Sequence, residues 1–381
     1  MMTDEDRGGR RADGNLIVGL LCDPDLPDHI AHQLADELPE LLSCRVSDNV
    51  TWQVQAVCDP FEAAESGDRV MDRARERVRT TDWDLVVCVT DLPLWSGTRP
   101  VIANVADAWR VALVSLPALG GFALRRRARD TVVPIIARLA DGVLREDRIG
   151  APATPQSTHR AGPARWVCPR DEDIDVEIVV ASGYGHLRLL AGMVRANRPW
   201  KLAAGLSAAL AGGMAGSAFG ILYSNIWQLA AALHPLRLAL VAVAACAVMV
   251  AYLVVGHRLW EHRSAEVPRF SRHVGLFNVA TLATLGLGVL LFFAALLAID
   301  LAAVALIIPP SYLHSVLGQP VGWTDYLTLA VMASAMGMVA GAVGSGLEAD
   351  ASVRAAAYGH REIKRREQLR RIDEDTSTSG R

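Results

Sequence analysis

Hydrophobic residues follow different patterns in the two halves of this 381-residue chain. Before residue 148, short apolar runs alternate with segments in which apolar residues recur at helical spacing. After residue 200 come four apolar stretches of about 20 residues, a length of helix that crosses a hydrocarbon core of roughly 30 Å. Apart from Arg237 they contain no charged residue, and they are Leu202–Tyr223, Leu236–Val255, Phe277–Ile299 and Tyr326–Leu347. We therefore expect a soluble domain followed by a four-helix transmembrane bundle.

The alternating pattern of the first half predicts an α/β domain with an open, mostly parallel, Rossmann-like sheet. The expected strands are 15–21, 50–58, 83–90, 101–105 and 111–116, and the expected helices are 28–42, 67–80 and 122–144. Only about five residues separate the last two strands, too few for a parallel crossover, so we expect one antiparallel edge. The apolar run 174–181 is a candidate extra strand.

Composition sets the remaining boundaries. The first residues are charged and lack an apolar run, so a disordered lead and no signal peptide are expected. A later segment rich in Pro, Ala, Thr and Arg is typical of a linker. The division is 1–14 lead, 15–147 α/β domain, 148–185 linker with the candidate strand, 186–200 juxtamembrane helix, 201–347 four-span transmembrane domain and 348–381 basic tail.

Three carboxylates follow predicted strands, at the edge where open α/β sheets bind ligands. They are Asp23, Asp59 and Asp91, with Thr98 and Arg99 on the loop after the third. These residues are ligand-binding candidates, for a divalent cation or a polar molecule. The alternative is local: Asp before Pro begins turns, and Asp near a helix start accepts backbone N–H groups.

Known catalytic and cofactor motifs are absent from the sequence. It contains no GxGxxG after the first strand, no GxxxxGK[ST], no GxSxG and no HExxH. The six cysteines form no CxxC pair, and His29 and His32 lack a third ligand, so no metal site is predicted. No catalytic residue is assigned, the cofactor is unknown, and a non-enzymatic role is favoured. A net charge of −3 gives no argument for nucleic-acid binding.

Basic residues beside the first span predict contact with anionic lipid headgroups. The segment 186–197 is amphipathic, and the residues expected at the membrane interface are Arg195, Arg198, Trp200 and Lys201. The alternative is a helix packed on the α/β domain. The Gly120-Gly121 pair before four arginines, Arg125, Arg126, Arg127 and Arg129, indicates either an anion site at a helix start or another basic patch for lipid.

Loop charges predict the orientation of the spans. The loop 257–273 and the tail after residue 348 are rich in Arg, whereas the loops 224–235 and 300–325 contain no Lys or Arg. By the positive-inside rule we expect a multi-pass plasma-membrane protein with both termini in the cytosol.

The third apolar run continues after Asp300 to Pro310, which is longer than a bilayer requires. We expect the helix to tilt, kink or project, with 301–318 as an outer segment along the surface. Asp300 is then either an interfacial residue or a rare intramembrane carboxylate, and its position near the end of the span favours the interface.

Small residues recur every four positions in the first and fourth spans. Such faces let helices approach closely in lipid, so these two spans are expected to pack together, or to pair between protomers in a homo-oligomer. The residues expected in this packing are Gly212, Gly216 and Gly220 on one helix and Gly337 and Gly341 on the other.

Several stretches carry a family resemblance, among them LAGMVRANRPW at 190–200, AFGILYSNIW at 218–227 and VGSGLEA at 343–349. With WDLVVCVTDLPL and ALVSLPALG, they resemble a group of uncharacterised actinobacterial multi-pass membrane proteins, some of which carry a methylenetetrahydrofolate dehydrogenase label. The resemblance implies a bilayer-embedded protein. No site residue follows from it, because the chain before residue 200 has neither a dinucleotide fingerprint nor a lysine.

Together these features favour a membrane protein whose cytosolic α/β domain senses a ligand or docks a partner. A small oligomeric transporter or channel is one alternative. A membrane-anchored metal-dependent enzyme that uses the three Asp residues is another.

Overall fold

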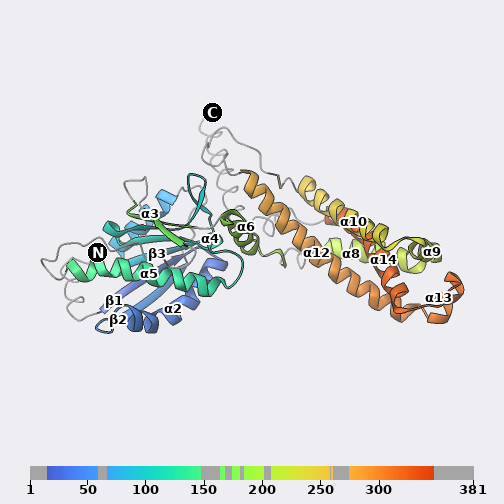
Figure 1. Cartoon of the computed structure of the whole chain (residues 1–381), viewed down its shortest axis with the longest axis horizontal. Helices are drawn as coiled ribbons and strands as arrows, with labels where there is room; N and C mark the ends of the chain where they lie inside the picture. The colour runs from blue at the N-terminus through green and yellow to red at the C-terminus, as the bar shows by residue number, and fades with distance from the viewer. Residues whose placement is uncertain are drawn as a thin grey trace, which may run out of the picture. The chain divides into compact units, whose positions relative to one another are not determined.

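The computed structural model describes residues 15–58, 67–146, 164–167, 174–180, 184–200, 207–257, 259–260 and 274–346. The chain divides into two compact units, Met1–Ala196 and Asn197–Arg381, here called the α/β unit and the helical unit. Figure 1 labels their helices and strands.

The α/β unit contains a mixed eight-stranded sheet in the order β2-β1-β3-β6-β5-β8-β7, with β4 paired to β5. The pairs β1–β2, β1–β3 and β3–β6 are parallel, and the other pairs are antiparallel. Strands β1, β3 and β6 are almost fully buried, which fits their continuous apolar sequences. The strands are β1 Asn15–Cys22, β2 Thr51–Cys58, β3 Leu85–Thr90, β4 Leu94–Ser96, β5 Arg99–Ala106, β6 Val111–Ser115, β7 Ala164–Val167 and β8 Val176–Val180.

The antiparallel pairing expected between the last two predicted strands is present as β5–β6. It is not the edge of the sheet, because β8 and β7 continue beyond β5. The candidate strand after the linker therefore joins the sheet as β8, and β7 was not predicted.

Helices cover both faces of the sheet (Figure 1). Helices α2 and α5 contact each other, while α3 packs with the opposite face through Val70, Met71 and Ala74. In α2, the residues Ile30, Leu34, Leu38 and Leu42 recur every four positions and are buried, as the sequence period predicts. The helices are α2 Leu26–Arg45, α3 Gly67–Thr80, α4 Leu116–Leu119, α5 Leu124–Glu146 and α6 Gly185–Ala196, with a 3-10 turn at Asp107–Trp109.

Helix α6 docks on α4 through a close backbone contact at the buried Gly192. A Cβ atom at Gly192 would collide with the Pro117 carbonyl oxygen and lie 2.6 Å from the Pro117 Cα. Gly121 makes a similar approach, since its Cβ would lie 2.9 Å from the Ala191 carbonyl oxygen. Helix α6, which covers most of the amphipathic segment 186–197, thus packs within the α/β unit. This is the alternative that the sequence left open beside a helix at the membrane interface.

The helical unit contains three helices long and apolar enough to cross a membrane, namely α10, α12 and α14. Helix α8 is apolar but shorter, with 16 residues. Residues 201–206 before it lie outside the described residues. The helices are α8 Ser207–Leu222, α9 Ser224–Ala232, α10 Pro235–Gly256, α12 Val274–Ile307, α13 Pro310–Leu317 and α14 Trp323–Ser345.

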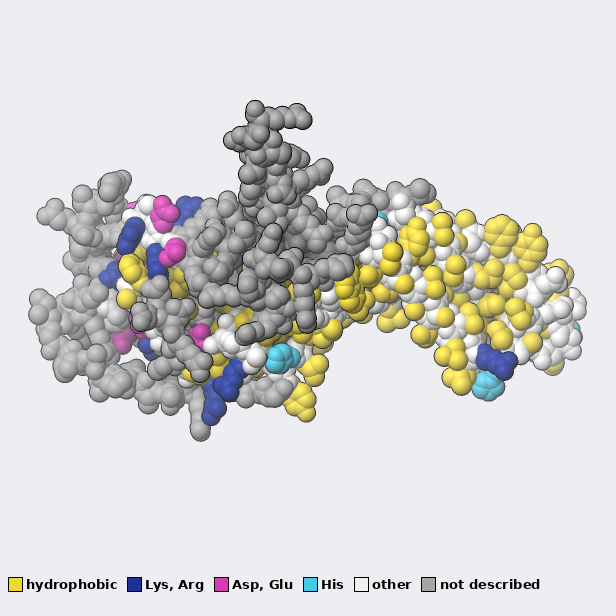
Figure 2. Space-filling view, turned by 90° about the horizontal axis from the view of Figure 1, so that it is seen from above, with side chains coloured by type: hydrophobic (Ala, Val, Ile, Leu, Met, Phe, Trp, Pro, Cys, Tyr) yellow, Lys and Arg dark blue, Asp and Glu magenta, His cyan; other side chains and the backbone are white. Residues whose placement is uncertain are grey.

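Many large apolar side chains are exposed on this unit, and the face seen in Figure 2 shows them in yellow among white atoms. Water disfavours such a surface, whereas lipid tails do not, so the unit is built for an apolar solvent. Exposed residues of this kind on α10 and α12 are Leu236, Leu240, Val243, Val255, Leu287, Leu290, Ile299 and Leu306.

Helix α12 is continuous through Asp300 and ends at Ile307. The expected outer segment 301–318 is therefore wrong in part: its first seven residues extend α12, and only Pro310–Leu317 forms a separate helix. The physical reason lies in Pro309 and Pro310, which lack the N–H groups that would continue the helix, whereas Asp300 has no such effect.

Helices α8 and α14 pack with their backbones in close contact. A Cβ atom at Gly216 would collide with Ala340 Cβ, and one at Gly220 would lie 2.8 Å from Ala333 Cα. A Cβ atom at Gly212 would lie 3.2 Å from the Ala340 carbonyl oxygen. One at Gly337 would lie 2.6 Å from the Gly213 oxygen, and one at Gly341 would lie 2.9 Å from the Ala209 oxygen. The five glycines expected to pack helices all lie at this contact.

Replacing Gly216 or Gly341 with Leu should separate α8 from α14, because the new side chain has no space. Overpacking typically costs about 1–3 kcal/mol, and here backbone would have to move as well. We expect a lower midpoint for thermal unfolding in detergent. The control is Gly286→Leu on α12, where no atom lies within 4 Å of the Cβ position. Equal midpoints for all three variants would contradict this packing.

Gly192→Ala should displace α6 from α4, since the methyl group meets the fixed backbone of Pro117. Faster hydrogen exchange in 185–196 is the expected result. Gly142→Ala in α5 is the matched control, because its Cβ position is open and Ala favours a helix over Gly by about 1 kcal/mol. Unchanged exchange in Gly192→Ala would show that the contact does not hold α6.

Candidate functional site

The carboxyl ends of β1 and β3 form the topological switch point of the sheet. The chain leaves β1 toward β2 on one side, and β3 lies on the other side of β1. In open α/β sheets, ligands bind beside such a point. Cys22 pairs with Val89, so the next residues, Asp23 and Thr90, are neighbours at this edge.

Buried polar residues hold the loops at this edge. Asp23 is fully buried, and its N–H donates to the Val89 carbonyl oxygen at 3.1 Å. Thr90 Oγ1 accepts the Leu92 N–H at 3.1 Å, while Ser115 Oγ donates to the Leu92 carbonyl oxygen at 2.6 Å. The loop after β3 is thus fixed from two strands.

The five predicted ligand-binding residues do not form one group. Asp23 and half-buried Asp91 lie at neighbouring strand ends, whereas Asp59 lies outside the described residues. Thr98 and Arg99 are exposed at the β4–β5 hairpin, whose turn uses Gly97 at φ 62°. The hairpin turn accounts for Thr98 and Arg99 at these positions without a ligand. Among the described residues, no group of three or more His, Cys, Asp or Glu is placed to hold a metal.

The Cys22 thiol beside Asp23 is a structural group. Its Sγ lies 3.6 Å from Asp28 Oδ1 and 3.4 Å from the Val57 carbonyl oxygen, and its single S–H can donate to either acceptor. Burial, and then the nearby Asp28 carboxylate, raise the pKa of this thiol far above its ordinary value. Because the thiolate is the nucleophile, Cys22 is unreactive at neutral pH.

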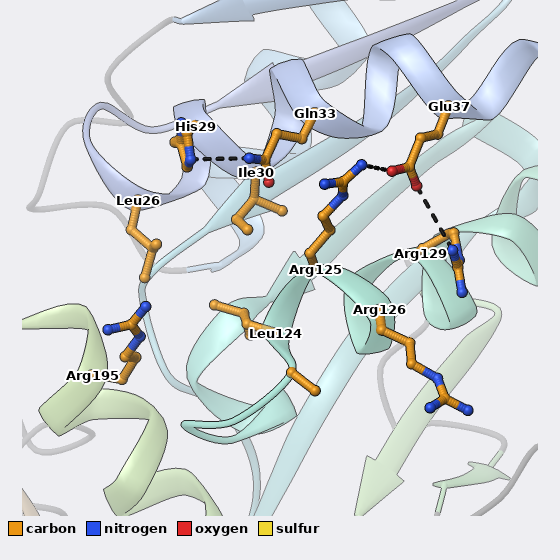
Figure 3. Close-up of a pocket in the computed structure, with 11 residues that line it drawn as sticks. Leu26, His29, Ile30, Gln33, Glu37, Leu124, Arg125, Arg126, Arg129 and Arg195 are labelled. Carbon is orange, nitrogen blue, oxygen red and sulfur yellow. Dashed lines mark hydrogen bonds and ion pairs between the residues drawn. The ribbon is translucent and has the colours of Figure 1, made fainter.

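A cleft of about 530 Å³ opens between α2, the start of α5, and α6 (Figure 3). Its walls combine apolar side chains with four arginines and one carboxylate. Figure 3 shows Arg125, Arg126 and Arg129 on α5 opposite α2, with Arg195 reaching in from α6. The lining is Leu26, His29, Ile30, Gln33, Glu37, Ala123, Leu124, Arg125, Arg126, Arg129 and Arg195.

The single carboxylate of the cleft, Glu37, binds two of its arginines. Glu37 Oε1 pairs with Arg125, and Oε2 lies 3.8 Å from an Arg129 nitrogen. Arg126 is largely exposed and lies 3.7 Å from Asp130. With four guanidinium groups against one lining carboxylate, the cleft is cationic.

Two further arginines converge beside the cleft on one backbone oxygen. Arg127 and Arg188 donate to the Leu119 carbonyl oxygen at 2.7 and 3.1 Å. Gly120, at φ 91°, lets the chain turn there. Burial, and then the charge of Arg127, lower the pKa of Arg188. Within the described part of the chain, neither guanidinium forms an ion pair with a carboxylate.

The sequence predicted a role for the arginines of α5, but it did not predict that Arg127 and Arg188 would donate to the same carbonyl oxygen. The α4–α6 contact that joins them is tertiary, and its only sequence signals are Gly121 and Gly192. Of the expected interface residues, Arg195 lines the cleft, Trp200 is exposed and Arg198 has φ 50°. Lys201 lies outside the described residues.

In the helical unit, Asp300 is the polar residue that differs from expectation. It is only 2% exposed, and the Ser334 hydroxyl donates to its Oδ2 at 2.7 Å. Asp300 therefore faces α14 rather than the outside of the unit.

No protein-family model matches the chain, and no curated protein or solved structure is significantly similar to it. The resemblance to actinobacterial membrane proteins therefore stays a prediction.

The buried Cys22 thiol should make the α/β unit less stable in alkali. The unfolded chain releases this proton above about pH 8.5 and the folded chain holds it, so the free energy of unfolding falls as pH rises, by up to ~1.4 kcal/mol per pH unit. Urea unfolding of the detergent-solubilised chain between about pH 7 and pH 10 measures the slope. Cys22→Ala should flatten it, and Cys44→Ala, at an exposed cysteine, should not. Equal slopes in all three proteins would disprove the effect.

Proposed function

We propose that this chain is a multi-pass membrane protein whose cytosolic α/β unit binds an anionic ligand, and so senses a small molecule or docks an acidic partner. The observation that carries the proposal is the convergence of Arg127 and Arg188 on one carbonyl oxygen. Two positively charged groups repel each other, so they are seldom held this close unless a negatively charged group binds to both.

The energetic argument starts from the distance between the two guanidinium groups. Because both touch the Leu119 oxygen, the donor nitrogens are at most about 6 Å apart, where two unit charges near a protein surface repel by about 1–3 kcal/mol. The shared carbonyl offsets part of this repulsion with its dipole. A phosphate or carboxylate group would remove the repulsion and accept charge-assisted hydrogen bonds.

The neighbouring cleft supports a small organic anion rather than a bare ion. Arg188 and Arg195 lie seven residues apart on α6, which places them on one face of the helix. Arg195 enters the cleft, where Leu26, Ile30 and Leu124 supply apolar contact. Apolar walls with a few convergent polar groups are typical of small-molecule sites, and the volume is in the usual range.

The membrane part of the proposal rests on α10, α12 and α14, with the shorter apolar helix α8 as the proposed fourth span. The arginine-rich loop and tail would then lie in the cytosol with both termini, by the positive-inside rule. The same arginines fit the phosphates of anionic lipids, so a lipid headgroup is the other source of this chemistry.

Removing Arg188 should weaken anion binding. The full chain in zwitterionic nanodiscs is titrated with inorganic phosphate and with a soluble phosphomonoester, and binding is followed by thermal shift. We expect Arg188→Gln to bind at least about tenfold more weakly, the loss of ~1.5 kcal/mol expected for one charge-assisted hydrogen bond. Arg45→Gln, at an exposed α2 residue away from the cleft, is the matched control.

The lipid source is tested by repeating the titration in nanodiscs with anionic lipid. If headgroups occupy the site, they will reduce the response to soluble phosphate in the wild type and not in Arg188→Gln. Identical titrations of wild type, Arg188→Gln and Arg45→Gln in both lipids would overturn the proposal.

A further inference from the structure

A buried polar cluster joins three helices of the helical unit. Asp300 of α12 accepts a hydrogen bond from Ser334 of α14 at 2.7 Å, and Ser334 is fully buried. The hydroxyl of Ser217 on α8 lies near the Asp300 carboxyl group and donates to the Met214 carbonyl oxygen at 3.2 Å. Apolar residues surround the three, among them Leu296 and Val304 of α12.

The position of Ser334 shows how deep this cluster lies. Ser334 is the twelfth of the 23 residues of α14, and so the midpoint of the helix. At 1.5 Å per residue, it is about 16 Å from either end, close to the centre of a hydrocarbon core of roughly 30 Å. Its partner Asp300 is therefore at membrane depth if α14 spans a bilayer, although it is near the end of its own helix.

The helices around Asp300 bring no opposite charge to it. Helices α8 and α9 contain no ionisable side chain. The ionisable side chains on the other helices are Asp325 and Tyr326 of α14, Arg237, Cys246 and Tyr252 of α10, and His314 and the exposed Tyr312 of α13. Tyr326 donates to the Ile308 carbonyl oxygen, His314 bonds to the Gln319 oxygen, and Arg237 is exposed. Among the described residues, Asp300 has no ion-pair partner.

We propose that Asp300, Ser217 and Ser334 form a proton-binding site inside the membrane. A hydronium ion gives its proton to one carboxylate oxygen, which leaves a neutral carboxyl group and a water molecule, and release reverses the transfer. The Ser334 hydroxyl donates to the charged form, and the single O–H of the neutral form can donate to one of the two serine oxygens, so each state has a hydrogen bond. Ionisable residues at such depth commonly relay protons.

The ligand chemistry favours a proton over a metal ion. Calcium and magnesium take six or more oxygen ligands, whereas this cluster offers one carboxyl group and two hydroxyls. Sodium remains the cation that the experiment has to separate from the proton. The site lies in a different unit from the arginine cleft, so it does not depend on the anion-binding proposal.

The test is labelling with a hydrophobic carbodiimide, which enters apolar regions and reacts with protonated carboxyl groups. The full chain in nanodiscs is treated from about pH 5 to about pH 9, and the label at Asp300 is measured by mass spectrometry of peptides. We expect labelling to fall about tenfold per pH unit above a midpoint, as for any single titrating group. Replacing potassium with sodium at constant pH should have no effect.

Serine variants test whether the hydroxyl groups position the carboxyl group. Ser334→Ala removes a donor to the charged form, so labelling should persist to higher pH. Ser345→Ala is the matched control on the same helix, since that buried hydroxyl bonds to its own Ala342 carbonyl oxygen. We expect the control to follow the wild-type profile. Both profiles are read on proteins whose thermal unfolding matches the wild type.

Three results would overturn the proposal. Protection by sodium would show that the site binds sodium instead. Labelling that does not change with pH would show a permanently neutral, structural carboxyl group. An absence of label at Asp300 across the whole range would show that the group does not take up a proton.

Discussion

Close contact between helix backbones, permitted only where glycine removes the side chain, is the constraint on which both units depend. Gly192 lets α6 lie against Pro117 of α4, and Arg188, one turn earlier, thereby reaches the Leu119 carbonyl oxygen. In the helical unit, Gly216 lets α8 lie against α14, and the adjacent Ser217 thereby comes within reach of Asp300. In each unit the polar group is placed by a contact that contains no polar side chain.

Local patterns predict the elements of this fold better than their partners. The period of Ile30, Leu34, Leu38 and Leu42 is a property of one helix, so the sequence is sufficient to predict its buried face. The short link between β5 and β6 likewise requires an antiparallel pair. The pairing of β8 with β5 joins segments about 75 residues apart, and no local pattern records such a partner. The continuation of α12 to Ile307 was readable in Pro309 and Pro310, because two successive prolines outweigh one aspartate as a helix end.

The candidate sites divide in the same way. Neighbouring positions for Asp23 and Asp91 follow from a general rule about parallel strand ends. Thr98 and Arg99 follow Asp91 closely in the chain, but the tight β4–β5 hairpin carries them to an exposed turn. For Asp300, counting along its own helix gave a place near the end, whereas its neighbour Ser334 places it at the midpoint of α14. Depth in a bundle depends on the stagger of the helices, which a single hydropathy profile does not contain.

The two units hold uncompensated charge of opposite kinds in opposite surroundings, and this decides what each can respond to. The guanidinium groups of Arg127 and Arg188 are partly solvated, so salt screens them over about 10 Å and any anion at sufficient concentration can relieve their repulsion. Asp300 is only 2% exposed, so salt screens it weakly, and a proton is the smallest species that removes the charge. Ionic strength therefore acts on the α/β unit with little effect on the cluster at Asp300. A pH change near neutrality leaves arginine charged, because its pKa lies far above that range, while it can still change the protonation state of a buried carboxyl group. The two sites are consequently separable by solution conditions alone, without a mutation in either.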